Sequence, residues 1–200
     1  MIQFENCVQY FGRIILNEIY DNGAKAWVAG GAVRDYFMGV PMKTDYDLFF
    51  PDQENYEKVE KLLIDNGAEA IWTSDNGTKV KYKGRKFDLV KHYFKSPVDT
   101  INQFDFTVSM FAVDNQQVYH GHSSFIDLSK RQLMFNAIPF PESSMSRAFR
   151  YYQKGFKMCR GEMAKLIGAI KALKPREESI NDDGSEKSSL DHAAMFIGLD

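Results

Sequence analysis

The sequence predicts an α+β fold in which a mixed sheet is flanked by helices and followed by a short helical neck. Apolar residues recur at helical spacing between Phe4 and Ile19, which predicts an amphipathic first helix. A β-prone run that stops at Gly30-Gly31 is followed by a short helical segment and a second apolar strand. Alternating β-prone residues between 68 and 92 predict a series of paired strands.

Composition limits the classes of protein that the chain can belong to. Two hundred residues are enough for one domain with a real core, and the formal net charge of −2 gives no general attraction to nucleic acid. Cys7 and Cys159 are isolated and lack metal-like spacing, so we expect free thiols in a reducing compartment. No apolar run is long enough to cross a bilayer and the N-terminus has no signal-peptide pattern, so we expect no membrane contact and a cytoplasmic location.

Glycine marks the end of each helix predicted in the first third of the chain. The first helix stops at Asn22-Gly23, and the helix over 32–38 ends at Gly39 with Pro41 just beyond. A third helix runs over 53–66, with Asp52 as its N-cap and Gly67 after its end. Strands are expected between these helices over residues 25–29 and 46–50.

The middle of the chain reads as strands and turns, and its last third as helices and a tail. The predicted strands are 68–73, 79–83, 86–92 and 117–121, with turns at 74–77 and 83–85. Ser96-Pro97 opens a short helix and Pro141 opens a longer one. From Glu177 the composition is acidic and polar, which is typical of a mobile tail. His120 and His122 have no acidic or cysteine partner close in sequence, so we interpret them as ordinary surface histidines rather than metal ligands.

Asp45 and Asp47 are the strongest chemical signal. Side chains two apart on a strand share a face, so both carboxylates lie side by side, close to the Gly30-Gly31 turn whose backbone N–H groups suit an anion. Adjacent carboxylates repel each other unless a cation lies between them. Two divalent ions about 3.5–4 Å apart would supply that charge and hold a phosphate for in-line displacement, with Arg34 contacting the same oxygens. The alternative is a capped turn followed by an edge strand with solvated aspartates.

These residues resemble a known signature. Gly30-Gly31-Ala32-Val33-Arg34-Asp35, followed after a loop by Asp45-Tyr46-Asp47, is similar to the Gly-Gly-x-Val-Arg-Asp and Asp-x-Asp motifs of the class II tRNA nucleotidyltransferase and bacterial poly(A) polymerase family. The resemblance covers residues 24–158, the head and neck of that family. It implies a nucleotidyltransferase head over 1–120 and a helical neck over 121–175, with the acidic tail over 176–200.

The resemblance implies two sets of site residues. The catalytic and metal-binding set holds two Mg²⁺ ions and consists of Asp45, Asp47 and Asp88. Asp88 is the third carboxylate, which could also draw the proton from an attacking hydroxyl; read alone, it is an outward-facing, solvated strand residue. The nucleotide-binding set consists of Gly30, Gly31, Arg34, Asp105, Arg147 and Arg150. Asp35 is expected to brace the turn rather than to bind metal.

Two motifs depart from the family pattern. Asp105-Phe106-Thr107 matches part of the family's Arg-Arg-Asp-Phe-Thr-Ile-Asn-Ala, but Gln103 and Phe104 replace the two arginines and Ser109 replaces the asparagine. The Glu-Asp-x-x-Arg motif, with which CCA-adding enzymes read the incoming base, is absent, and Ser144 stands where its arginine would fall. We therefore expect a change in nucleotide affinity or choice, and the sequence leaves open whether base selection is templated.

The resemblance implies transfer of a nucleoside monophosphate from an NTP, ATP included, to a hydroxyl, with release of pyrophosphate. The expected acceptor is an RNA 3′ end, tRNA or tRNA-like, held by the basic residues and interleaved aromatics of 147–176. A solvated basic face is the alternative for that segment. The family's helical body has no counterpart here, and a partner subunit is one way to replace it. Other functions that the sequence leaves open are the same chemistry on a protein or small-molecule hydroxyl, and a catalytically silent module that binds RNA or protein.

Overall fold

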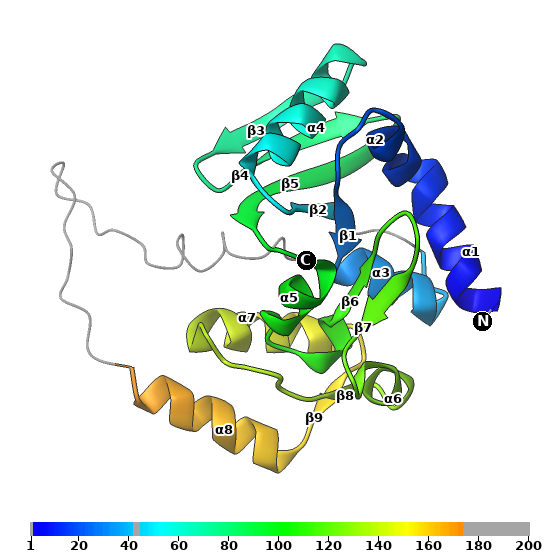
Figure 1. The fold of residues 1–200 in the computed structure, drawn as a ribbon. Helices are drawn as coiled ribbons and strands as arrows, with labels where there is room; N and C mark the ends of the chain where they lie inside the picture. The colour runs from blue at the N-terminus through cyan, green and yellow to red at the C-terminus, as the bar shows by residue number, and fades with distance from the viewer. Residues whose placement is uncertain (1, 42–44, 174–200) are drawn as a thin grey trace, which may run out of the picture.

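The computed structural model describes residues 2–41 and 45–173, and its centre is a seven-stranded sheet with the order β3-β4-β5-β2-β1-β6-β7 (Figure 1). The strands are β1 (Trp27–Ala29), β2 (Tyr46–Phe50), β3 (Glu69–Ser74), β4 (Gly77–Tyr82), β5 (Arg85–Tyr93), β6 (Phe111–Val113) and β7 (Val118–His120). Strands β2 and β5 pair in parallel, and the other neighbours pair antiparallel. The mixed sheet and its helices confirm the predicted α+β fold.

Helices surround the sheet and continue beyond it. They are α1 (Ile2–Phe11), α2 (Asn17–Asp21), α3 (Gly31–Met38), α4 (Gln53–Asp65), α5 (Pro97–Asn102), α6 (Ser124–Ser129), α7 (Pro141–Gln153) and α8 (Arg160–Lys171), with a 3-10 turn η2 (Thr107–Ser109). Two short strands, β8 (Gln132–Leu133) and β9 (Lys157–Met158), pair in parallel beside α7. Helices α7 and α8 lie at the opposite end of the molecule from α4 (Figure 1).

The first helix is interrupted where the sequence predicted continuity. A π-helical turn, η1 (Gly12–Leu16), separates α1 from α2. Ile14, Ile15 and Leu16 are all buried, and three consecutive apolar residues occupy too wide an arc of a regular helix to be buried on one narrow face. Gly12 makes close contact possible at this turn, because a Cβ there would lie 2.7 Å from Oδ1 of Asn17.

Several predicted ends and caps are confirmed. The Asp52 side chain accepts a hydrogen bond from the backbone N–H of Asn55 at the start of α4, and Ser96 does the same for Asp99 at the start of α5. Gly39 ends α3 in the left-handed region, with φ of 63°. The acidic tail lies outside the described residues, and the predicted domain boundaries stay predictions. No described helix combines the length and the hydropathy needed to cross a membrane.

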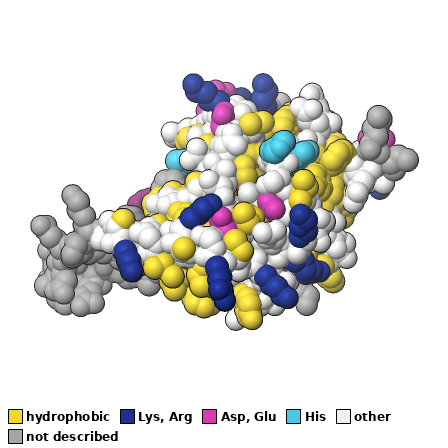
Figure 2. Space-filling view, turned by 90° about the horizontal axis from the view of Figure 1, so that it is seen from below, with side chains coloured by type: hydrophobic (Ala, Val, Ile, Leu, Met, Phe, Trp, Pro, Cys, Tyr) yellow, Lys and Arg dark blue, Asp and Glu magenta, His cyan; other side chains and the backbone are white. Residues whose placement is uncertain are grey.

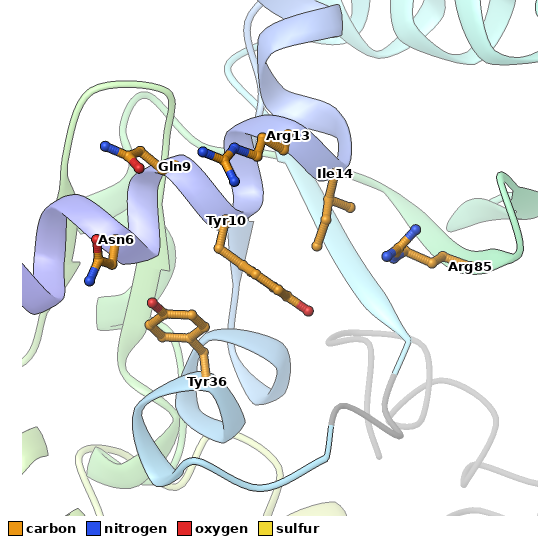
Figure 3. Close-up of a pocket in the computed structure, with 7 residues that line it drawn as sticks. All are labelled: Asn6, Gln9, Tyr10, Arg13, Ile14, Tyr36 and Arg85. Carbon is orange, nitrogen blue, oxygen red and sulfur yellow. The ribbon is translucent and has the colours of Figure 1, made fainter.

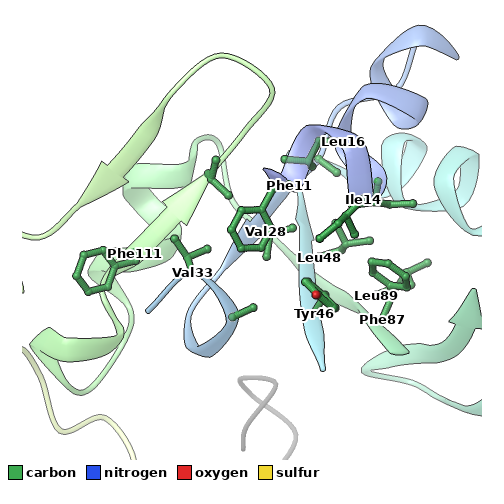
Figure 4. Close-up of a cluster of buried hydrophobic side chains, with 14 of the residues drawn as sticks. Phe11, Ile14, Leu16, Val28, Val33, Tyr46, Leu48, Phe87, Leu89 and Phe111 are labelled. Carbon is green, nitrogen blue, oxygen red and sulfur yellow. The ribbon is translucent and has the colours of Figure 1, made fainter. Parts of the chain in front are cut away.

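Alternation along β2 divides its side chains between two clusters. Tyr46, Leu48 and Phe50 join the larger core, which Figure 4 shows between the sheet and the first helix. Phe49 points to the other face and joins a smaller cluster with Trp27 and residues of the segment around α5. Because Asp47 alternates with Leu48, it also points to this second face. One face of β2 therefore packs on the larger core, while the Asp47 carboxylate points to the opposite face of the sheet.

Candidate active site

Four side chains form one row across the centre of the sheet. Asp47 on β2 and Asp88 on β5 are partners in the parallel register, Ala29 on β1 lies opposite Asp47, and Lys79 on β4 lies opposite Asp88. Residues paired across neighbouring strands point to the same face of a sheet. The row thus places two carboxylates side by side and a lysine directly beyond them.

Lys79 connects Asp88 with the third carboxylate of the predicted catalytic set. Its Nζ lies 2.7 Å from Oδ2 of Asp45 and 3.2 Å from Oδ2 of Asp88. These three side chains are partly exposed, whereas Asp47 is only 6% exposed. The structure therefore brings the predicted catalytic residues Asp45, Asp47 and Asp88 into one neighbourhood and adds an ammonium group to it.

The electrostatics of Lys79 reflect its two acidic neighbours. Burial acts to lower the pKa of this ammonium, but hydrogen bonds and charge from Asp45 and Asp88 outweigh burial and raise the pKa above its ordinary value of 10.5. Lys79 is consequently a permanent cation at neutral pH. Lys79 was not among the site residues predicted from the sequence, although the sequence contains a signal for it. Lys83-Gly84, with φ of 48° and 76°, forms a two-residue hairpin turn that pairs Tyr82 with Arg85. Counting back along both strands from that pair places Lys79 opposite Asp88.

The donor set suits a divalent cation in its chemistry. Carboxylate oxygens are the ligands that Mg²⁺ prefers, and the position of the Lys79 ammonium shows that a cation is stabilised between Asp45 and Asp88. Within the described part of the chain, no three acidic, histidine or cysteine side chains are already arranged around one point. The donor chemistry therefore suits a metal ion, while in the present arrangement the Lys79 ammonium occupies the place between Asp45 and Asp88. His120 instead stacks with Phe4 and packs against Phe125.

Gly30 forms the turn next to the carboxylates. Its φ of 79° and ψ of −132° lie in a region that side chains rarely adopt, and a Cβ there would be 3.8 Å from Oδ2 of Asp47. Helix α3 begins at the next residue, Gly31, so its N-terminal N–H groups open near Asp47. The predicted phosphate contacts of Gly30 and Gly31 stay predictions, but the turn lies beside the carboxylates as that function requires.

Substituting Gly30 with alanine is expected to destabilise the protein by about 1–3 kcal/mol, because a Cβ is strained at this φ and ψ. Chemical denaturation monitored by circular dichroism measures the loss. Gly168→Ala is the control, since nothing lies within 4 Å of a Cβ at this position within α8. An unchanged unfolding midpoint for Gly30→Ala would contradict the expected strain.

Arg34 is buried between α3 and α7 instead of extending from the helix start. Its side chain is 1% exposed, donates from Nε to Asp35 over 2.7 Å and from a terminal nitrogen to the Tyr151 hydroxyl over 2.8 Å. Tyr151 also hydrogen-bonds with Ser109. This network joins the glycine turn to α7. The phosphate contact predicted for Arg34 stays a prediction, and the expectation that Asp35 braces the turn agrees with its ion pair.

Asp105 and Arg147 make a second buried connection to α7. Arg147 Nε lies 2.7 Å from Asp105 Oδ2, which also accepts a hydrogen bond of 2.9 Å from Ser144, and all three residues are buried. Ser144, at the position of the missing base-reading arginine, is thus part of this contact. Arg150 lies three residues further along α7 and is partly exposed. The nucleotide contacts predicted for Asp105, Arg147 and Arg150 are untested.

Arg147→Met is expected to destabilise the protein by about 3–5 kcal/mol, because Asp105 would keep a buried charge without its partner. Lys58→Met is the matched control. It removes a cation from an exposed pair with Glu54, where such pairs contribute about 0.2–1 kcal/mol. Equal urea midpoints for the two variants would show that the buried pair contributes little.

Phe104 explains one departure from the family motif. Its ring is buried in the second cluster, 6.1 Å from the Phe49 centroid, and would lie 3.8 Å from a Cβ on Gly30. An apolar ring therefore stands beside the turn at the place of a family arginine. The Phe104 ring packs against the Gly30 turn and, unlike an arginine, cannot make a charge-assisted hydrogen bond to a phosphate.

The surface of α7 carries exposed aromatic side chains among basic ones. Phe149 and Tyr152 are 62% and 71% exposed and lie three residues apart, so they share one face of the helix. Figure 2 shows lysine and arginine side chains distributed around apolar side chains on the face seen from below. Exposed basic residues of this part of the chain are Lys130, Arg131, Lys154, Lys157 and Arg160.

A family model described as the Gabija anti-defense 2 family matches residues 2–131. The chain belongs to this family. The match covers all seven strands of the sheet and the residues of the carboxylate row, and it ends before α7. A search of curated proteins found no match to the chain.

Solved structures with the same fold as this chain include tRNA-processing enzymes. One described as a tRNA-processing enzyme in an apo form has a TM-score of 0.64 at 19% identity, over 82% of this chain and 47% of that one. The Bacillus stearothermophilus CCA-adding enzyme in complex with CTP has a TM-score of 0.62 at 20% identity, over 76% and 41%. The Thermotoga maritima CCA-adding enzyme complexed with tRNA has a TM-score of 0.59 at 18% identity, over 79% and 42%. The chain spans less than half the length of these proteins, and the likeness confirms the nucleotidyltransferase-like fold that the motifs indicated.

Proposed function

We propose that the protein is a nucleotidyltransferase that counteracts a Gabija defence by transferring a nucleoside monophosphate from an NTP to a hydroxyl group. The family to which the chain belongs supports the anti-defence role. The observation that carries the chemistry is the pairing of Asp47 with Asp88 in register, with Asp45 next to them and the Gly30 turn adjacent. Structures of the same fold that contain CTP support an NTP as the donor.

The proposed reaction uses residues already described. The triphosphate lies against the N-terminus of α3, where backbone N–H groups favour negative charge. The acceptor oxygen attacks the α-phosphorus, the bond from that phosphorus to the bridging oxygen breaks, and pyrophosphate leaves. Asp88 takes the proton of the attacking hydroxyl. Mg²⁺, two ions in the expected site, would be held by Asp45, Asp47 and Asp88 and would neutralise charge on the phosphates.

An RNA 3′ end is the acceptor that we propose. Solved structures of this fold include one with tRNA and one with a primer tRNA and an ATP analogue. Phe149 and Tyr152 offer exposed rings on which bases can stack, and the surrounding lysines and arginines can contact phosphates. Because Ser144 is engaged with Asp105, base selection would not use a template arginine at that position. We propose that the reaction takes place in the cytoplasm. We also propose that a partner subunit supplies further contacts to the RNA.

A second function is favoured by Lys79. Its ammonium already pairs with two of the three carboxylates and supplies one of the positive charges that a divalent ion would bring. The protein would then bind a nucleotide or RNA, act against the defence by that binding, and transfer nothing. This candidate predicts NTP binding without product formation.

The deciding experiment incubates the pure protein and Mg²⁺ with each α-³²P-labelled NTP, in the presence of total tRNA or of purified Gabija components. Asp47→Asn is the inactive control. Label that enters RNA and is absent with the variant supports transfer to RNA. Label on a Gabija protein would move the acceptor to protein. NTP binding without any labelled product would support the non-catalytic candidate.

A further inference from the structure

The structure contains a polar hollow on the opposite face of β2 from the carboxylates. Figure 3 shows it between the first helix, α3 and the start of β5. It has a volume of about 440 Å³, within the range of small-molecule sites, and its polar lining residues are Asn6, Gln9, Tyr10, Arg13, Tyr36 and Arg85. The hydroxyl oxygen of Tyr10, which lines the hollow, lies 3.4 Å from the hydroxyl oxygen of Tyr46 on β2. Tyr46 points to the opposite face of the sheet from its neighbour Asp47. The hollow is therefore separate from the candidate active site.

Positive charge gathers here without a compensating carboxylate. Among the described lining residues, two are arginines and none is acidic. Within residues 2–41 and 45–173, no ion pair involves Arg13 or Arg85, while the neighbouring acid Glu18 is paired with Lys83 at 2.7 Å. In a protein with a net charge of −2, these two guanidinium groups, which Figure 3 shows on either side of Tyr10, make the hollow locally attractive to an anion.

The local backbone supports a built site. Arg13 and Ile14 lie in the π-helical turn η1, a rare conformation that is common at functional sites. Asn6, Gln9 and Arg13 are separated by three and four residues, so they form one ridge on the first helix. The turn continues directly into a buried run, which anchors the helix that carries Arg13.

The remaining lining groups suit a nucleobase. The Tyr10 and Tyr36 rings lie 5.2 Å apart between centroids at an angle of 43°, and both are only partly buried. Aromatic faces stack on bases of any kind, and the carboxamides of Asn6 and Gln9 can both donate to and accept from base edges. The arginines would take the phosphate and the tyrosines and amides the base.

We propose that this hollow is a second nucleotide site, which binds a nucleoside monophosphate through Arg13 and Arg85 and its base through Tyr10, Tyr36 and the neighbouring carboxamides. It lies on the far side of β2 from the reaction site. It needs neither the carboxylates nor a divalent ion, and so does not depend on the proposed transfer activity.

Calorimetric titration with AMP in the presence of EDTA tests the site. We expect wild-type protein to bind AMP, and Arg13→Gln and Arg85→Gln each to weaken binding by about tenfold or more, because each removes a charge-assisted contact. Lys61→Gln, which removes one exposed positive charge from α4, is the control and should bind as the wild type does. Because Arg13 and Arg85 are exposed, neither substitution is expected to lower the unfolding temperature.

Further arms separate this site from the active site and from simple anion binding. Crosslinking with 8-azido-AMP should label the peptide that contains Tyr10, and this label should persist in Asp47→Asn. AMP binding that Asp47→Asn abolishes and the arginine variants retain would overturn the proposal and leave the transfer activity untouched. Inorganic phosphate that binds as tightly as AMP would also overturn it, since the base would then contribute nothing.

Discussion

Asp47→Asn and Asp88→Asn are each expected to reduce nucleotidyl transfer by about 1,000-fold. Each substitution keeps the size of the side chain and removes a negative oxygen from the centre of the row. Loss of one ligand or proton acceptor in such a site removes several kcal/mol of transition-state stabilisation, and each 1.36 kcal/mol is a factor of ten in rate. The measurement is the initial rate of label transfer from the NTP that the wild type prefers.

Stability separates a catalytic effect from unfolding. The urea midpoint of each variant is measured beside its rate, and a large loss of rate with a midpoint close to that of the wild type identifies a catalytic effect. Asp65→Asn, at the exposed end of α4, is the control with the same chemical change and should retain full activity. Full activity in Asp47→Asn would exclude this row as the reaction site.

Lys79→Met is expected to raise the affinity for Mn²⁺, used as a spectroscopic substitute for Mg²⁺, by roughly tenfold. The substitution removes the cation that lies 2.7 Å and 3.2 Å from the two carboxylates, so a divalent ion no longer competes with it. Two unit charges about 4 Å apart interact by about 4 kcal/mol at an effective dielectric constant of 20, but measured ion pairs between partly exposed side chains contribute only about 1 kcal/mol. Since about 1.4 kcal/mol corresponds to a factor of ten in affinity, we expect a change of roughly tenfold. Electron paramagnetic resonance of free Mn²⁺ measures the affinity.

The same variant should depend on metal for its stability. Without a divalent ion, Lys79→Met leaves three carboxylates uncompensated and is expected to unfold at a lower temperature than the wild type, and saturating Mg²⁺ should reverse this difference. Lys81→Met, two residues along the same strand and exposed, is the control and should change neither property. Equal Mn²⁺ affinity in Lys79→Met and wild type would show that the ammonium does not compete with the ion.

The sequence by itself determined the local architecture of the site. Gly30-Gly31 as a turn before a helix, and Asp47 on a strand with Asp45 just before its first residue, follow from backbone preference and from the two-residue period of a strand. Both depend on neighbours within a few residues, which is why pattern and motif were sufficient to predict them. The Lys83-Gly84 turn, which sets the register that pairs Lys79 with Asp88, is a local signal too, although Lys79 was not predicted from it.

Only the tertiary structure decided which residues far apart in the sequence lie next to each other. The parallel pairing of β2 with β5 puts Asp88 in register with Asp47, and chain folding brings Arg34 to Tyr151 and Asp105 to Arg147, 117 and 42 residues apart. Residues that read as phosphate and nucleotide ligands are thereby buried against the neck helix. Parallel pairing and helix docking are selected by the burial of whole apolar faces, a property of the packed chain that no short segment encodes.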